Sequence, residues 1–151
     1  MDKIDTLILS GGGIKCVSMI GSLLELEKND NFFNKIVKYA GSSAGSIICA
    51  LLCIGYTPQE ILDGFFSQKN LIYDSYFKIP FNLLKFGLFS GNKFEKYLKI
   101  LFTKKNISEN ITFNELFKMN NKILVITGTS LNSRETFYFN YRTFPDMSII
   151  E

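Results

Sequence analysis

The feature that most constrains this chain is a pattern that occurs twice near its N-terminus: a short β-rich run, a turn of small residues, and an apolar helical segment. The first run, residues 6–10, meets consecutive glycines before an expected helix over 14–28. The second run, 36–40, meets Gly41 before an expected helix over 44–54. Strands that alternate with helices form parallel sheets through right-handed βαβ connections. We therefore expect an α/β fold with a central, mostly parallel sheet that helices flank on both faces.

Turn and capping signals place the remaining elements. Thr57 and Thr112 each precede a helical segment and have a glutamate three residues later, a spacing that forms a capping box. Residues 122–130 and 135–141 are β-rich and separated by a short turn, which is typical of a hairpin. We expect the further helices at 57–68, 92–102 and 112–119, and irregular or short helical structure at 70–91.

Composition indicates one packed domain over residues 1–151, because apolar residues make up 46% of the chain. The net charge of +3 is too small for a dedicated nucleic-acid binder but fits transient contact with an anionic membrane surface. No secretory signal is visible, and the longest apolar stretch, 47–54, is far shorter than the roughly 20 residues that span a bilayer. These features predict a cytoplasmic or peripherally membrane-bound protein and leave its oligomeric state open.

The cysteines Cys16, Cys49 and Cys53 are interpreted as buried thiols in a reducing compartment. Cys49 and Cys53 lie four residues apart in an expected helix and therefore share a face. The chain has no histidine and no second cysteine pair, so a zinc site is not expected. We expect neither a metal nor another cofactor.

The segment Gly41-Ser42-Ser43-Ala44-Gly45 is a G-x-S-x-G sequence between an expected strand and an expected helix. In that context the motif forms a nucleophile elbow, a turn so sharp that the serine needs small neighbours. Ser43 would then lie at a helix N-terminus, where the helix dipole stabilises negative charge. We interpret Ser43 as a nucleophile, and the alternative is a serine that only caps the helix.

The glycine run Gly11-Gly12-Gly13 also lies between a strand and a helix. Its unshielded amides are able to face an anionic oxygen at the helix N-terminus. It lacks the spacing of a Walker A phosphate loop, and a dinucleotide-binding motif would need glycine where Cys16 stands. We interpret the run as an oxyanion hole beside the elbow. Lys15 is either a solvated side chain or a contact for a substrate head group.

The absence of histidine restricts the mechanism. A Ser-His-Asp triad cannot be built from this chain. If Ser43 is activated, its base must be a carboxylate or a lysine. An ordinary α/β-hydrolase is thereby excluded, and a serine–aspartate dyad is favoured.

The two motifs together resemble the patatin-like phospholipase family. The resemblance rests first on Ser-Gly-Gly-Gly-Ile-Lys at 10–15 and on Gly-Ser-Ser-Ala-Gly at 41–45. It continues through residues 87–91, 124–129 and 139–147, so it covers nearly the whole chain. It implies an α/β fold and a Ser-Asp dyad. It also implies hydrolysis of acyl esters in phospholipids, lysophospholipids or acylglycerols without a cofactor, through an acyl-enzyme on Ser43.

The chain departs from the family pattern at two points. Cys16 stands where the family usually has glycine, and the dyad aspartate lies in an Asp-Gly-Gly or Asp-Gly-Ala motif that would follow Glu151. Asp63 lies in an expected helix and Asp146 precedes methionine, so neither is assigned as the base. We expect this chain to be the N-terminal portion of the domain, without its C-terminal strands and helices, and to be weakly active or inactive alone.

Two alternatives to a lipid hydrolase remain open. One is an inactive lipid-binding or regulatory patatin-like module, and the other is an anion- or nucleotide-binding α/β domain that uses the glycine run. The apolar segment 77–89 is interpreted as core packing or as a flap that contacts the membrane.

Overall fold

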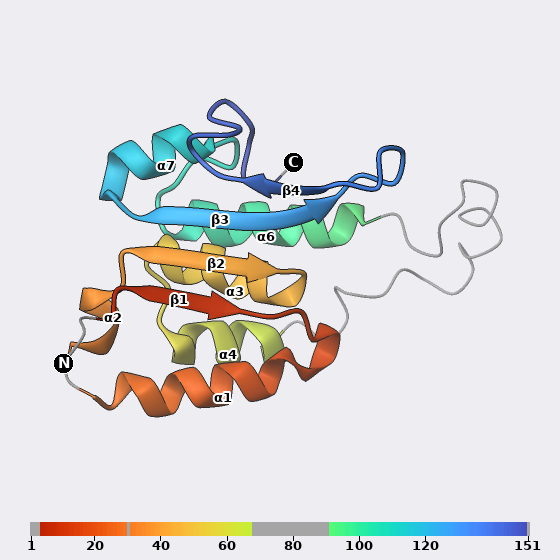
Figure 1. Cartoon of the computed structure of the whole chain (residues 1–151). Helices are drawn as coiled ribbons and strands as arrows, with labels where there is room; N and C mark the ends of the chain where they lie inside the picture. The colour runs from red at the N-terminus through yellow and green to blue at the C-terminus, as the bar shows by residue number, and fades with distance from the viewer. Residues whose placement is uncertain (1–3, 30, 68–90, 151) are drawn as a thin grey trace, which may run out of the picture.

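The computed structural model describes residues 4–29, 31–67 and 91–150, which form a sheet with the strand order β1-β2-β3-β4 (Figure 1). Strands β1 (Thr6–Leu9), β2 (Lys38–Ser42) and β3 (Ile123–Thr129) are parallel. Strand β4 (Thr136–Phe139) is antiparallel to β3, which confirms the predicted hairpin. The expectation of a mostly parallel sheet in an α/β fold is therefore confirmed.

The helices largely follow the sequence prediction. Both capping boxes form, since the backbone amides of Glu60 and Glu115 donate to the hydroxyls of Thr57 and Thr112. A short helix, α2, was not expected, and β2 begins and ends two residues later than predicted. The described helices are a 3-10 turn η1 (Gly13–Lys15), α1 (Cys16–Glu27), α2 (Phe32–Lys35), α3 (Ala44–Cys53), α4 (Pro58–Ser67), α6 (Asn92–Lys104) and α7 (Phe113–Asn120).

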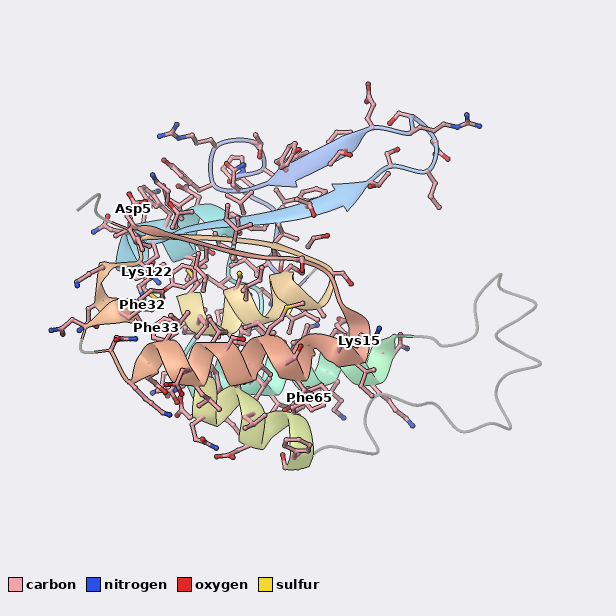
Figure 2. All side chains as sticks on the ribbon, turned by 60° about the horizontal axis from the view of Figure 1, so that its bottom comes forward. Asp5, Lys15, Phe32, Phe33, Phe65 and Lys122 are labelled. Carbon is pink, nitrogen blue, oxygen red and sulfur yellow. The ribbon has the colours of Figure 1, made fainter. Side chains whose placement is uncertain are left out.

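The described helices do not cover both faces of the sheet, as the sequence led us to expect. Figure 2 shows α1, α3, α4 and α6 on the same side of it. Tyr39 and Leu124 face these helices and are buried, whereas Ile8 on the other face is 74% exposed. The reason is the strand order: β1 to β2 and β2 to β3 are crossovers in the same direction, and right-handed crossovers in one direction place their helices on one face.

The thiols lie in the core, as predicted. Cys49 and Cys53 point from α3 and are 0% and 1% exposed, and Cys16 is also buried. The Cys49 Sγ donates to the Ala40 carbonyl at 3.3 Å. Burial raises the pKa of both Cys49 and Cys53 to about 12, so these thiols stay protonated and pack as small apolar groups.

Candidate active site

Ser43 is the residue between β2 and α3, and its side chain is exposed. Its φ of 51° and ψ of −126° lie in the region that favours glycine, which costs of order 1–3 kcal/mol for another residue. Its hydroxyl makes no capping hydrogen bond to α3. Ser43 is thus the N-cap residue of α3 by position, but its side chain does not cap the helix. A nucleophile elbow requires a strained, exposed serine, and the backbone and exposure of Ser43 meet that requirement.

Gly41 and Gly45 allow this turn to form. A Cβ atom on Gly41 would lie 2.5 Å from the Cα and N of Ser46, and one on Gly45 would lie 2.5 Å from the carbonyl oxygens of Leu9 and Ser10. These contacts are with backbone, which cannot move aside. Gly41 thus lets α3 approach its own strand, and Gly45 lets α3 approach β1.

Ser46 holds the elbow in a way that the sequence analysis missed. Its Oγ donates to the Ser43 carbonyl at 2.5 Å, and its amide donates to the same oxygen at 2.9 Å. Two donors on one carbonyl fix the peptide that follows Ser43. A serine three residues after the nucleophile was the available signal, because Ser side chains often bond to the backbone three or four residues earlier.

The glycine run forms the turn between β1 and η1. Gly13 has a φ of 51° and no heavy atom within 4 Å of the position that a Cβ would take. The Gly12 carbonyl accepts a hydrogen bond from the Lys15 amide at 3.0 Å, which closes the turn. Within the part of the chain that the structure describes, the amides of Gly11, Gly12 and Gly13 donate no backbone hydrogen bond.

The two turns meet at the carboxyl ends of β1 and β2. A Cβ on Gly11 would lie 3.2 Å from the Ser43 Cβ and 3.9 Å from its Oγ, so the Gly11 backbone packs against the Ser43 side chain. A larger residue at position 11 would press on the serine. The structure therefore brings the hydroxyl and the glycine turn together, as the two motifs predicted.

The other candidate residues lie apart from this contact. Lys15 is exposed at the N-terminal end of α1 (Figure 2), and Ala44 lines an apolar pocket among α1, α3, α4 and α6. The Asp63 carboxylate accepts a hydrogen bond from Gln59 at 2.8 Å on α4, and Asp146 is exposed. In the described part of the chain, neither carboxylate forms a hydrogen bond with Ser43.

Two further features concern the surroundings of the site. No three His, Cys, Asp or Glu side chains among the described residues are grouped to hold a metal ion. None of the described helices combines the length and apolarity needed to cross a membrane. The segment 77–89, interpreted above as a flap or as core, lies outside the described residues.

The fold and the paired turns define an α/β protein whose candidate site lies where parallel strands end, beside a serine elbow. The family model of the patatin-like phospholipases matches residues 7–151, and the chain belongs to that family. It is 38% identical over 147 residues to "Probable lipid hydrolase 463L" of Invertebrate iridescent virus 6, covering 96% of this chain and 50% of the relative. It is 35% identical over 149 residues to "Uncharacterized protein R571" of Acanthamoeba polyphaga mimivirus, covering 97% and 49%. The chain thus spans about half the length of these curated relatives.

A solved structure shares the fold. The chain resembles ExoU of the Pseudomonas aeruginosa type III secretion system, solved in complex with SpcU, with a TM-score of 0.71 and 24% identity. The match covers 98% of this chain and 37% of ExoU. At this identity the likeness supports the architecture alone.

Proposed function

We propose that the protein is a lipid acyl hydrolase in which Ser43 is the nucleophile and the amides of Gly11, Gly12 and Gly13 form the oxyanion hole. Its substrates are phospholipids, lysophospholipids or acylglycerols, reached through transient contact with a membrane surface. Membership of the patatin-like phospholipase family supports the reaction class. A relative that covers nearly this whole chain and is named a probable lipid hydrolase supports it further.

The contact between Gly11 and Ser43 is the observation that carries the residue assignments. A nucleophile acts only if donors lie near the oxygen that becomes negative. The exposed Ser43 side chain packs against a turn whose amide hydrogens are unused. A phosphate-binding glycine turn would not require a strained serine beside it.

The proposed reaction has two stages. A base takes the Ser43 proton while its Oγ bonds to the ester carbonyl carbon, and the carbonyl oxygen becomes an oxyanion that the glycine amides stabilise. The C–O bond then breaks, the base returns the proton to the leaving alcohol, and an acyl-enzyme remains. Water repeats the sequence and releases the fatty acid. Each oxyanion donor typically contributes about 2.7–4 kcal/mol.

The base is proposed to be an aspartate, as in the dyad that the family resemblance implies. Neither Asp63 nor Asp146 is assigned to it, because the first is paired with Gln59 and the second is an exposed residue of a loop. The chain spans about half the length of its relatives, so the proposal concerns the whole protein.

The test is covalent labelling of the whole protein with a fluorophosphonate, followed by identification of the labelled residue. We expect the adduct on Ser43, its loss in Ser43→Ala, and its retention in the matched variant Ser42→Ala. Labelling should accompany release of fatty acid from phospholipid or acylglycerol. If Ser43 stays unlabelled while a control serine hydrolase reacts, the nucleophile assignment fails. Binding of lipid without labelling would identify an inactive lipid-binding module, and heat with micromolar nucleotide would identify an anion-binding domain.

A further inference from the structure

Helix α6 carries an excess of positive charge that the rest of the chain does not have. It contains four lysines and one glutamate, so its formal net charge is +3, which equals the net charge of the whole chain. The acidic and basic side chains outside α6 therefore balance each other in number. The excess positive charge of the protein is thus concentrated on one helix.

The apolar face of α6 attaches this helix to the fold. Leu101 and Phe102 are buried in the core, and the Tyr97 hydroxyl donates a hydrogen bond to the Gly64 carbonyl of α4 at 3.0 Å. These contacts fix the rotation of α6 about its own axis. The opposite face of the helix is therefore a preformed surface.

Lysine and isoleucine alternate along this opposite face. Lys96, Ile100 and Lys104 are spaced four residues apart, so their side chains follow one another along the helix. All three are exposed, and Ile100 is 45% exposed. We call Lys96, Lys99, Ile100 and Lys104 the basic face of α6. These four residues line an open surface hollow together with Thr103 and Glu109.

Most of the charge on the basic face is not neutralised by neighbouring carboxylates. The Lys99 Nζ forms an ion pair with Glu95 at 2.9 Å. Among the residues that the structure describes, Lys96 and Lys104 form no ion pair. Glu109 is the one acid among the residues that line the hollow. An anionic partner would therefore be attracted to this face.

The arrangement of the basic face fits an extended anionic surface with an apolar interior. Lys96 and Lys104 are about 12 Å apart along the helix axis, a distance that suits neighbouring head groups better than one small anion. At a bilayer interface an apolar side chain enters between the head groups while lysine ammonium groups stay at their level. Ile100 would have no comparable contact on a nucleic-acid backbone. The face therefore favours a phospholipid bilayer as its partner.

The position of α6 relates this face to the candidate site. The N-terminal end of α6 lies at the end of the sheet where β1, β2 and β3 finish (Figure 1). Phe94, close to that end of the helix, lines the same pocket as Ala44, which directly follows Ser43. A bilayer in contact with the basic face would therefore lie beside the end of the sheet that carries Ser43.

We propose that the basic face of α6 docks the protein on bilayers that contain anionic phospholipids. Lys96 and Lys104 contact the head-group phosphates, and Ile100 enters between them. The proposal rests on the proposed function, in which the substrate is reached at a membrane surface. It adds the helix that makes this contact and the negative charge of the surface that the helix selects.

Vesicle binding tests the docking separately from hydrolysis. The whole protein carrying Ser43→Ala is sedimented with vesicles of phosphatidylcholine alone, or of phosphatidylcholine mixed with phosphatidylserine. We expect binding to the mixed vesicles to be at least about tenfold tighter at low salt, and the difference to shrink at high salt because salt screens exposed charges. Equal affinity for the two kinds of vesicle at low salt would overturn the proposal.

Removing lysines from the basic face tests the location. Lys96→Gln/Lys104→Gln should weaken binding to the mixed vesicles about 25-fold, since each lysine near an anionic surface contributes about 1 kcal/mol, or about fivefold. The matched control Lys35→Gln/Lys118→Gln removes the same charge from exposed lysines of α2 and α7. If the two double variants keep the parental unfolding midpoint and bind equally well, net charge alone is responsible and the proposed face is wrong.

Ile100 distinguishes a bilayer from another polyanion. Ile100→Ser should weaken binding to the mixed vesicles about threefold or more, because threefold is less than the effect of one buried methylene. The control Met119→Ser changes an exposed apolar residue on α7 and should leave binding unchanged. Unchanged vesicle affinity in Ile100→Ser, together with tighter binding of a DNA duplex, would identify a nucleic-acid surface and contradict the proposal.

The docking and the hydrolase proposals fail in different ways. If vesicle binding and its variants behave as expected while Ser43 in the otherwise unaltered protein resists fluorophosphonate, the docking face stands and the hydrolase proposal fails. If Ser43 is labelled but Lys96→Gln/Lys104→Gln binds vesicles as tightly as the parent, the hydrolase proposal stands and the docking face is wrong.

Discussion

The two strand-to-helix turns of the site contain the same positive backbone angle but use glycine differently. The turn after β1 contains three glycines, of which Gly13 has positive φ, and offers bare amides. The turn after β2 puts a serine, Ser43, at the same φ of 51° and places its glycines on either side of it. Glycine in the first turn leaves the backbone amides without side chains beside them. Glycine in the second removes them from the path of a helix.

The glycines of the two turns look alike in the sequence but have different surroundings in the structure. At Gly41 and Gly45 an added Cβ would meet backbone atoms within 2.6 Å. At Gly13 it would meet nothing within 4 Å, and at Gly12 it would meet the flexible end of Met19. Substitutions of the elbow glycines should therefore destabilise the fold through backbone clashes, whereas at Gly13 the cost of a side chain is backbone strain alone.

The largest expected effect is on turnover. Ser43→Ala should lower kcat of the whole protein by on the order of 10⁴–10⁶-fold, because the nucleophile is removed while the glycine amides remain. Fatty-acid release from a phospholipid or acylglycerol measures it, and Ser42→Ala provides the control. A variant that retains more than about a tenth of the activity would remove Ser43 from the mechanism.

A large loss of stability is expected at the elbow. Gly45→Ala forces the start of α3 away from the carbonyl oxygens of Leu9 and Ser10, and such overpacking typically costs about 1–3 kcal/mol. We expect the upper end of that range, because both contacts at 2.5 Å are with backbone oxygens. Urea unfolding gives the free energy of unfolding directly. A value within about 0.5 kcal/mol of the parent would show that α3 has room to shift.

Gly13 and Ser43 have the same φ of 51°, and substitutions at these two positions are expected to change the free energy of unfolding in opposite directions. Gly13→Ala should lower the free energy of unfolding by about 1–2 kcal/mol, the cost of the left-handed region for a residue with a Cβ. Ser43→Gly should raise it by about 1 kcal/mol, because it relieves the same strain. Equal shifts in the same direction would contradict the assignment of strain to Ser43.

The smallest expected effect is at a glycine that serves neither turn. Gly21 lies within α1, and no atom lies within 4 Å of its Cβ position. Gly21→Ala should therefore raise the free energy of unfolding by about 0.5–1 kcal/mol through helix propensity, with unchanged activity. Thermal or urea unfolding of Gly21→Ala and Gly45→Ala, measured side by side, compares an uncrowded helical glycine with a crowded one. Destabilisation by Gly21→Ala would reveal a packing role that the described residues do not show.

Local chemistry explains what the sequence predicted well. The capping boxes at Thr57 and Thr112 and the two turns at Gly11 and Gly41 depend on neighbours within a few residues, and each forms where it was expected. The proximity of the turns followed because adjacent parallel strands end at the same edge of a sheet.

Features that depend on the order of strands were not predictable from local pattern. The apolar runs of β1 and β2 indicated burial on both faces, yet the order β1-β2-β3 places the described helices on one face and leaves Ile8 exposed. The cavity beside Ala44 was also missed, because it arises where α1, α4 and α6 fail to fill the space along α3. No periodicity in a single helix reveals such a gap.

The packing of Gly45 on Leu9 and Ser10 has a consequence for how the site opens. Since α3 begins against the last residues of β1, and Gly11 rests on Ser43, neither turn is able to loosen while the other keeps its shape. The pair should behave as one cooperative unit, in which transient opening exposes both segments together. The amides of Lys15 and Ser46 donate to the carbonyls of Gly12 and Ser43, one in each turn. Hydrogen exchange at these two amides would then report a single shared opening rate, and no state with only one turn formed would be populated.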